Sequence, residues 1–127
     1  MATKIKTFEA ACKSLGLNPK SLPDVSKLPV KHRKALIAHY KLITITEAIN
    51  EGWQPDWSNL NEWKYYAWFF IKADKKRPSG FGFSYTGYAY TYAGTHVGSR
   101  LCFKSSELAK YAAKTFAKLY QEYLLMS

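Results

Sequence analysis

Residues 29–51 carry the pattern that most constrains the fold of this chain. Apolar side chains recur at alternating three- and four-residue spacing along one face: Ala35, Ala38, Leu42, Ile45 and Ile49. That spacing predicts an α-helix, for which Pro29 suits the first position and Gly52 the stop. A helix of about 22 residues with so wide an apolar band is expected to be the central element of the core.

Two further helices are predicted from their end signals. Residues 7–15 have Thr7 as an N-cap and Gly16 as a left-handed stop. Residues 106–125 follow Ser105 or Ser106 in the N-cap position. Prolines at 19, 23 and 29 stiffen the connection between the first helix and the long one.

Residues 63–73 and 81–92 alternate as β-strands do. In the first strand one face is predicted to hold Lys64, Tyr66, Trp68, Phe70 and Lys72, and the other Tyr65, Ala67, Phe69 and Ile71. In the second strand one face is predicted to hold Tyr88, Tyr90 and Tyr92. A basic turn at 73–80 joins them, and a third strand is expected at 99–105.

These elements predict a single α+β domain over residues 1–127. We expect two N-terminal helices, an antiparallel β-meander of about three strands, and a C-terminal helix packed on one sheet face. An aromatic share of 17% argues against intrinsic disorder. A net charge of +10 favours association with polyanions such as nucleic acid.

Catalytic and metal-binding patterns are sparse. The three histidines are scattered, and Cys12 and Cys102 lie ninety residues apart, which excludes a zinc knuckle or a C-x-x-C redox pair. Both cysteines are expected to be buried thiols in a reducing cytoplasm. We therefore predict no catalytic residues, no metal, no cofactor and no enzymatic activity.

No membrane association is expected. The first residues, MATKIKTFEAACK, lack the apolar core of a signal peptide, and no apolar run approaches the length of a membrane span. We expect a cytoplasmic protein.

The main functional hypothesis is nucleic-acid binding. Aromatic side chains on the sheet would stack on bases: Tyr66, Trp68, Tyr88, Tyr90 and Tyr92. Basic side chains would follow the phosphates: Lys31, Arg33, Lys34, Lys72, Lys75, Lys76, Arg77 and Arg100. The hypothesis requires that these rings stay accessible beside cations and are not consumed by internal packing.

Two alternatives use the same residues. The tryptophan-rich loop 53–63 and the glycine-flanked turn 94–100 would form a pocket for a small anion such as a nucleotide, held by Arg100 and His96. Exposed rings would otherwise form a homo-oligomer or partner interface. The turn around His96 is equally explained as a plain hairpin loop.

Three stretches support a family resemblance: SLPDVSKLPVKHRKALIAHYKL, NEGWQPDWSN and GSRLCFKSSELAKYAAKTFAKLY. Together they resemble small proteins, without an assigned activity, that bacteriophages and prophages of gut bacteria encode. The resemblance covers about residues 5–125. It implies an intracellular product of an infected bacterium that works on phage or host components, and it transfers no role to any residue.

Overall fold

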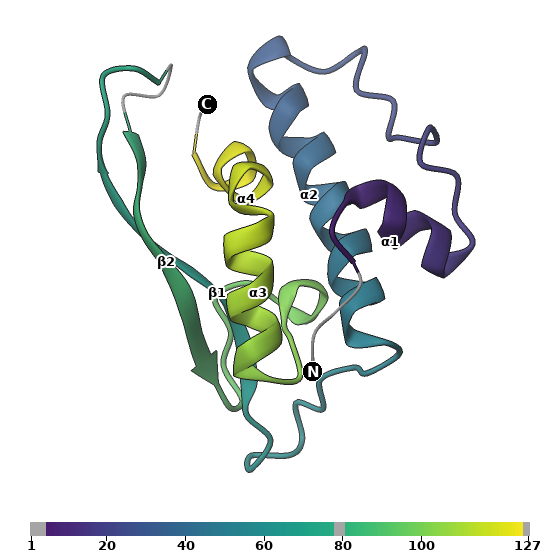
Figure 1. The fold of residues 1–127 in the computed structure, drawn as a ribbon, viewed down its shortest axis with the longest axis vertical. Coiled ribbons are helices and arrows are strands. Elements are labelled where there is room, and N and C mark those ends of the chain that lie inside the picture. Colours follow the sequence, from purple (N-terminus) through teal and green to yellow (C-terminus); the bar gives the residue numbers. More distant parts are fainter. Residues whose placement is uncertain (1–4, 78–80, 126–127) are drawn as a thin grey trace.

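The computed structural model describes residues 5–77 and 81–125, with residue 85 described by its backbone alone. The chain is α+β, with helices at both ends of the sequence and a β-hairpin between them. Figure 1 shows three layers: the hairpin, then α3 and α4, then α2 with α1 against it. Residues 78–80 of the predicted basic turn lie outside the described part.

The first helix, α1 (Phe8–Leu15), has the caps that its sequence predicts. The Thr7 hydroxyl accepts a hydrogen bond from the Ala10 amide at 3.0 Å, and Gly16 adopts a left-handed conformation with φ of 71°. The long helix α2 (Val30–Asn50) lies across it. Glu51, rather than Gly52, takes the left-handed position that ends α2, with φ of 51°.

Two antiparallel strands form the hairpin, β1 (Lys64–Ala73) and β2 (Phe81–Thr91). A β-bulge between Phe70 and Ile71 shifts their register. In the region predicted as a third strand, a short 3₁₀ helix η1 (Ser99–Leu101) comes first, and Phe103 alone pairs with Tyr65 as an isolated bridge. The turn at Gly98, with φ of 77°, directs the chain into that helix before it reaches β1.

The predicted C-terminal helix is divided into α3 (Ser106–Thr115) and α4 (Ala117–Leu124). Phe116 stands at the break with φ of −113° and ψ of 26°, and its ring is buried. α3 packs against both strands, whereas α4 packs mainly against α2. The break therefore lets one sequence stretch contact two different layers.

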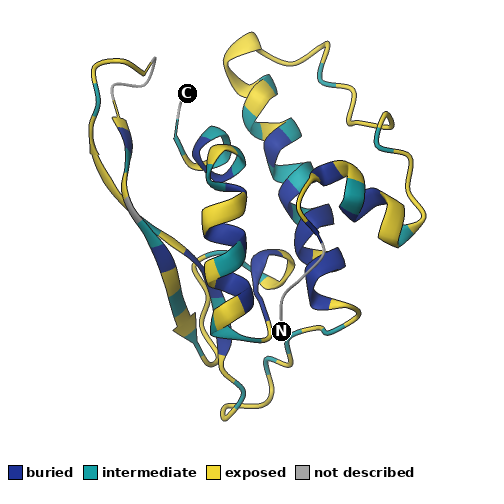
Figure 2. Cartoon of the chain, viewed as in Figure 1, coloured by how far each residue is buried: buried dark blue, intermediate teal, exposed yellow. Residues whose placement is uncertain are grey.

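The core lies between α3 and the facing sides of α1 and α2, as the burial pattern in Figure 2 shows. Leu42, Ile45 and Ile49 of α2 are almost fully buried, as the helical spacing predicts. Cys12 and Cys102 are both buried and unpaired. The residues described near the hairpin tip, by contrast, are mostly exposed (Figure 2).

Candidate nucleic-acid interface

The register of the hairpin separates the predicted aromatic residues into two groups. Tyr65 lies opposite Tyr90, Ala67 opposite Tyr88, and Tyr66 opposite Ala89. Residues directly opposite each other in an antiparallel pair point to the same face. Tyr88 and Tyr90 therefore share the face of Tyr65 and Ala67, so the rings of the predicted stacking set are divided between the two faces of the hairpin.

One hairpin face is turned toward the helices. Phe69 stacks on Phe83 with ring centroids 4.1 Å apart and lies 5.1 Å from the ring of Tyr120 in α4. Ala67 is buried in the core beside them. This part of the hairpin packs against the helices and supports the fold.

Further along the same face a group of rings pack on one another. We call it the tyrosine ladder, and its members are Trp63, Tyr65, Tyr88, Tyr90 and Tyr92. Trp63 stacks on Tyr90 at 4.6 Å and meets Tyr92 edge-on at 5.4 Å. Tyr88, Tyr90 and Tyr92 are 42%, 50% and 38% exposed, so each ring keeps an accessible side.

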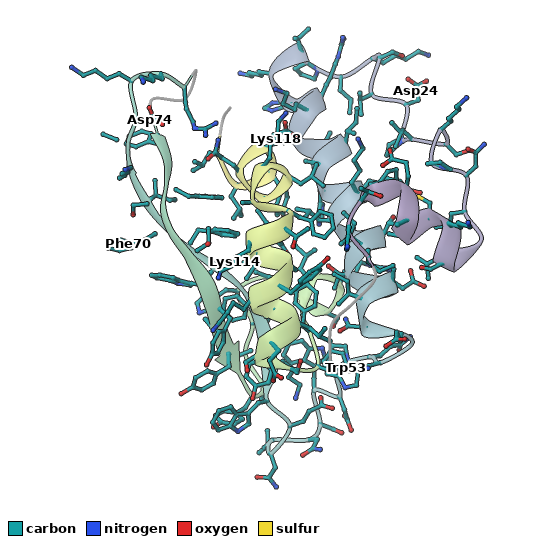
Figure 3. All side chains as sticks on the ribbon, in the orientation of Figure 1. Asp24, Trp53, Phe70, Asp74, Lys114 and Lys118 are labelled. Atoms are coloured by element: carbon teal, nitrogen blue, oxygen red, sulfur yellow. The ribbon has the colours of Figure 1, made fainter. Side chains whose placement is uncertain are left out.

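The opposite face holds a separate exposed group, here called the arm face, which consists of Trp68, Phe70 and Lys72. Trp68 and Phe70 are stacked, with centroids 5.8 Å apart and an interplanar angle of 19°. They are 40% and 61% exposed. Figure 3 shows Phe70 pointing away from the helical layers. Phe70 was absent from the predicted stacking set, although strand alternation already placed it with Trp68.

The base of this same face is covered. Tyr66 is only 8% exposed and lies 6.1 Å from the ring of His96. Burial raises the pKa of its hydroxyl. A ring enclosed in this way offers no side to a base, so Tyr66 does not fulfil its predicted stacking role.

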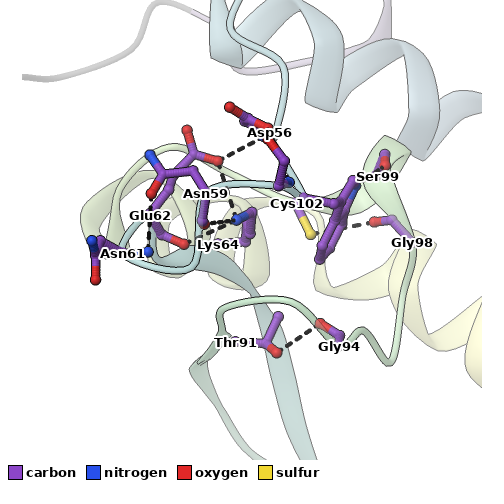
Figure 4. Close-up of polar contacts among 12 residues, drawn as sticks. Asp56, Asn59, Asn61, Glu62, Lys64, Thr91, Gly94, Gly98, Ser99 and Cys102 are labelled. Atoms are coloured by element: carbon purple, nitrogen blue, oxygen red, sulfur yellow. Dashed lines mark hydrogen bonds and ion pairs between the residues drawn. The ribbon is translucent and has the colours of Figure 1, made fainter.

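Lys64, at the start of β1, is fully buried below Tyr66. Its Nζ donates to the carbonyl oxygens of Asn59 at 3.0 Å and Glu62 at 3.1 Å, and it lies 3.4 Å from the Glu62 carboxylate (Figure 4). The ammonium also sits 5.2 Å above the ring of Trp57. Lys64 thus fastens the 53–63 loop to the hairpin, a role that sequence reasoning missed.

Cys102 lies close to this buried ammonium. Burial raises the pKa of its thiol to about 11, which the nearby Lys64 charge opposes only in part. A thiol with so high a pKa carries little thiolate at neutral pH and is a poor nucleophile. Among the described residues no group of three or more His, Cys, Asp or Glu is placed to hold a metal ion.

The hairpin tip provides the cations nearest to the arm face. Lys72, Lys75 and Lys76 are all exposed. Arg77 is used differently: its Nε lies 3.4 Å from the Asp74 carboxylate. When the amide of buried Gln121 in α4 is turned so that its oxygen faces the guanidinium, that oxygen accepts from Nε at 3.1 Å. A side chain at Gly82 would meet that guanidinium at 3.1 Å. Arg77 therefore anchors the tip to α4, so the prediction that it follows phosphates is not supported by its contacts.

The start of α2 holds the second predicted cluster. Arg33 donates to the carbonyl oxygens of Leu28 and Ser26, both at 2.8 Å, so its guanidinium braces the preceding loop. Lys34 reaches Glu122 at 3.9 Å while staying exposed, and Lys31 is exposed. Pro29 occupies the N-cap and makes no side-chain capping bond. The hairpin tip and the start of α2 lie at the same end of the molecule (Figure 1).

Arg100 lies elsewhere. It belongs to η1, beside the end of α2, at roughly 30 Å from the helix start by the rise of 1.5 Å per residue. There it lines a cleft of about 570 Å³ together with Trp53 and Glu47. His96 is not among the lining residues, so the predicted anion pocket of Arg100 and His96 is not formed. Arg100 therefore lies apart from the other basic residues that were predicted to contact phosphates.

Among the described residues no helix is long and apolar enough to cross a membrane. Comparisons of the chain with protein-family models, with curated proteins and with solved structures find no match.

Proposed function

We propose that this protein is a non-enzymatic, single-stranded nucleic-acid binder that uses the arm face and the lysines of the hairpin tip. The observation that carries the proposal is the stacked and exposed pair of Trp68 and Phe70 with Lys72 next on the same face. Following the phage resemblance, we place its action in the cytoplasm of an infected bacterium.

The ring pair suits unpaired bases. Two rings that are already nearly parallel can be extended by a third flat π-system, and each base stacked on an aromatic side chain contributes about 1–3 kcal/mol. In a duplex the faces of the bases are occupied by neighbouring pairs. The arm face therefore favours a single strand over a double helix.

The lysines supply the second half of the interaction. Lys72 follows the rings on the arm face, and Lys75 and Lys76 are exposed at the hairpin tip. The acidic residue at the tip, Asp74, is already paired with Arg77. The strand would place bases on Trp68 and Phe70 and phosphates along the tip. Lys31 and Lys34, at the same end of the molecule, would extend the positive potential rather than contact the same nucleotides.

The test is fluorescence anisotropy with labelled oligothymidylate and oligouridylate at low salt. Phe70→Ala and Trp68→Ala are each expected to weaken binding by about tenfold or more. Tyr88→Ala is the matched control, because Tyr88 is as exposed as Trp68 but belongs to the opposite face. Circular dichroism verifies folding. Equal losses for Phe70→Ala and Tyr88→Ala, or no binding by the wild type, would contradict the proposal.

A second function, self-association, is favoured by the tyrosine ladder. Its half-exposed rings lie on β2, whose outer edge pairs with no other strand in the described part of the chain. Unpaired strand edges invite pairing with another chain. Light scattering would show a concentration-dependent dimer that Tyr90→Ser dissociates, whereas a strict monomer at high concentration would reject this function.

A further inference from the structure

The residues that line the cleft at the end of α2 take no part in the proposed nucleic-acid binding. It encloses about 570 Å³ between the last turns of α2, the segment after it and η1. Its lining includes three apolar side chains, Ile43, Trp53 and Pro55, and two opposite charges, Glu47 and Arg100. Its volume lies within the range of ordinary small-molecule sites.

Neither of these two charges is used inside the fold. Glu47 and Arg100 are both exposed, and no ion pair joins them or binds either to another residue that the structure describes. The end of α2 reinforces the separation of charge, because its terminal carbonyl groups carry the negative end of the helix dipole. The α2 side of the cleft therefore favours a cation, and the η1 side favours an anion.

Two uncharged polar side chains of the lining, Asn50 and Thr46, are already hydrogen-bonded within the fold. Asn50 donates to the Cys102 carbonyl at 2.8 Å and accepts from the Lys104 amide at 3.3 Å. Thr46 donates to the Leu42 carbonyl at 2.7 Å. These bonds hold Asn50 and Thr46 in place and occupy their polar groups.

Ser99 also lines the cleft, and its hydroxyl group keeps a donor that is not used within the fold. Its oxygen accepts from the Trp57 indole at 2.6 Å, and the hydroxyl hydrogen has no acceptor among the described residues. A hydroxyl group whose oxygen already accepts one bond can still donate. Ser99 is next to Arg100 in the chain, so the two can donate together to one carboxylate.

We infer that this cleft binds a small zwitterion, an amino acid or a dipeptide with an apolar side chain. The ligand's ammonium would face Glu47 and the end of α2, its carboxylate would take hydrogen bonds from Arg100 and Ser99, and its apolar side chain would lie on Trp53. A polyanion is disfavoured here because Glu47 repels it, so the cleft is independent of the arm face.

The experiment is isothermal titration of the full chain with L-phenylalanine and L-leucyl-L-leucine as probes. Two analogues carry one charge each: 3-phenylpropionate keeps only the carboxylate and 2-phenylethylamine keeps only the ammonium. They test the recognition of each charge separately. At least one zwitterion is expected to bind at least tenfold more tightly than either analogue. No saturable binding of either zwitterion at about 10 mM, or equal affinity for the analogues, overturns the inference.

Charge variants separate the two halves. Arg100→Gln is expected to remove the preference for L-phenylalanine over 2-phenylethylamine, and Glu47→Gln the preference over 3-phenylpropionate. The matched controls are Lys104→Gln and Glu51→Gln, neighbouring charges that do not line the cleft. Thermal melts verify that each variant is folded. Controls that lose as much affinity as the cleft variants would overturn the inference, while oligonucleotide binding stays unchanged in either case.

Discussion

Lys64 shows at the scale of one residue how a buried charge can serve the fold. Desolvating an ammonium is unfavourable unless hydrogen bonds and an opposite charge replace water. Two carbonyl oxygens, the Glu62 carboxylate and the Trp57 ring provide that replacement. The tie holds the 53–63 loop to the start of β1.

Lys64→Met is expected to lower the free energy of unfolding by about 2–3 kcal/mol, because it leaves two carbonyl groups and a partly buried carboxylate without their donor. Urea denaturation measures the change. Lys75→Met, at an exposed position of the tip, should alter stability by less than about 0.5 kcal/mol. A Lys64→Met variant as stable as the wild type would show that the tie contributes nothing.

Tyr120 differs from Lys64, because its buried hydroxyl group has no hydrogen-bond partner among the described residues. Burial raises its pKa well above the ordinary value, and the Thr46 hydroxyl, which lies near without the geometry of a hydrogen bond, lowers it only in part. Tyr120→Phe is therefore expected to be neutral or to raise the free energy of unfolding by up to about 1 kcal/mol.

The matched control is Tyr111→Phe. The Tyr111 hydroxyl donates to the Ile5 carbonyl at 2.6 Å, so its removal should lower stability by about 1 kcal/mol in the same urea titration. If Tyr120→Phe proves as destabilising as Tyr111→Phe, the Tyr120 hydroxyl has a partner after all.

At the scale of elements, the first turn of α2 combines two unfavourable features. Pro29 provides no side-chain cap, and the first turn has no acidic residue. Cations in this turn oppose the helix dipole. The helix persists because its other end is deeply buried and because Arg33 braces the loop before it.

Lys31→Glu should therefore raise the free energy of unfolding by about 1 kcal/mol at low ionic strength and by less at high salt. Thermal denaturation at two salt concentrations measures this. Lys110→Glu, on an exposed position in the middle of α3, should change little. Destabilisation by Lys31→Glu would mean that the cation makes a favourable contact in the folded state.

The elements also show what local sequence determines. The Thr7, Gly16 and Ser105 caps were predictable because each depends on a side chain and the backbone within a few residues. The face of the hairpin on which each aromatic ring lies was not predictable from local sequence. Alternation shows which residues of one strand share a face. Which face of β1 lies with which face of β2 depends on the register, and a shift of one residue moves every side chain of a strand to the other face. The sequence therefore leaves open whether Tyr88 shares a face with Trp68, and the register places it on the other face.

Long-range contacts account for the other differences. Lys64 has the sequence context of an exposed strand end, and only the folding of residues 53–63 over it makes it buried. Arg77 and Gln121 are far apart in the chain, so no local pattern indicated that this arginine would be held by α4. Phe116 ends α3 without a glycine or proline, because its ring enters the core.

At the scale of the whole molecule, the proposed function depends on where the basic residues behind the net charge of +10 lie. The hairpin tip and the start of α2 bring lysines to one end, whereas Arg100 lies near the other end of α2. The arm face thus continues into the exposed lysines of the hairpin tip, whereas the cleft has Arg100 in its lining.

Three phosphate contacts from Lys72, Lys75 and Lys76 predict a log–log slope of affinity against salt of about −2 for a single strand. Anisotropy titrations between about 50 and 200 mM NaCl should then show a loss of about 15-fold. Replacing all three lysines by glutamine should flatten the slope toward zero. A slope unchanged in that variant would place the phosphate contacts elsewhere.

The four tryptophans allow the most direct test, because each reports a different place: Trp53 the cleft, Trp57 the Lys64 tie, Trp63 the tyrosine ladder and Trp68 the arm face. Indole N–H resonances in ¹H–¹⁵N spectra, assigned with single Trp→Phe variants, are followed during titration with oligothymidylate. We predict that the Trp68 signal shifts most, while those of Trp53 and Trp57 barely move. Binding that leaves Trp68 unchanged, or that shifts Trp53 or Trp63 most, would contradict the arm face as the nucleic-acid site.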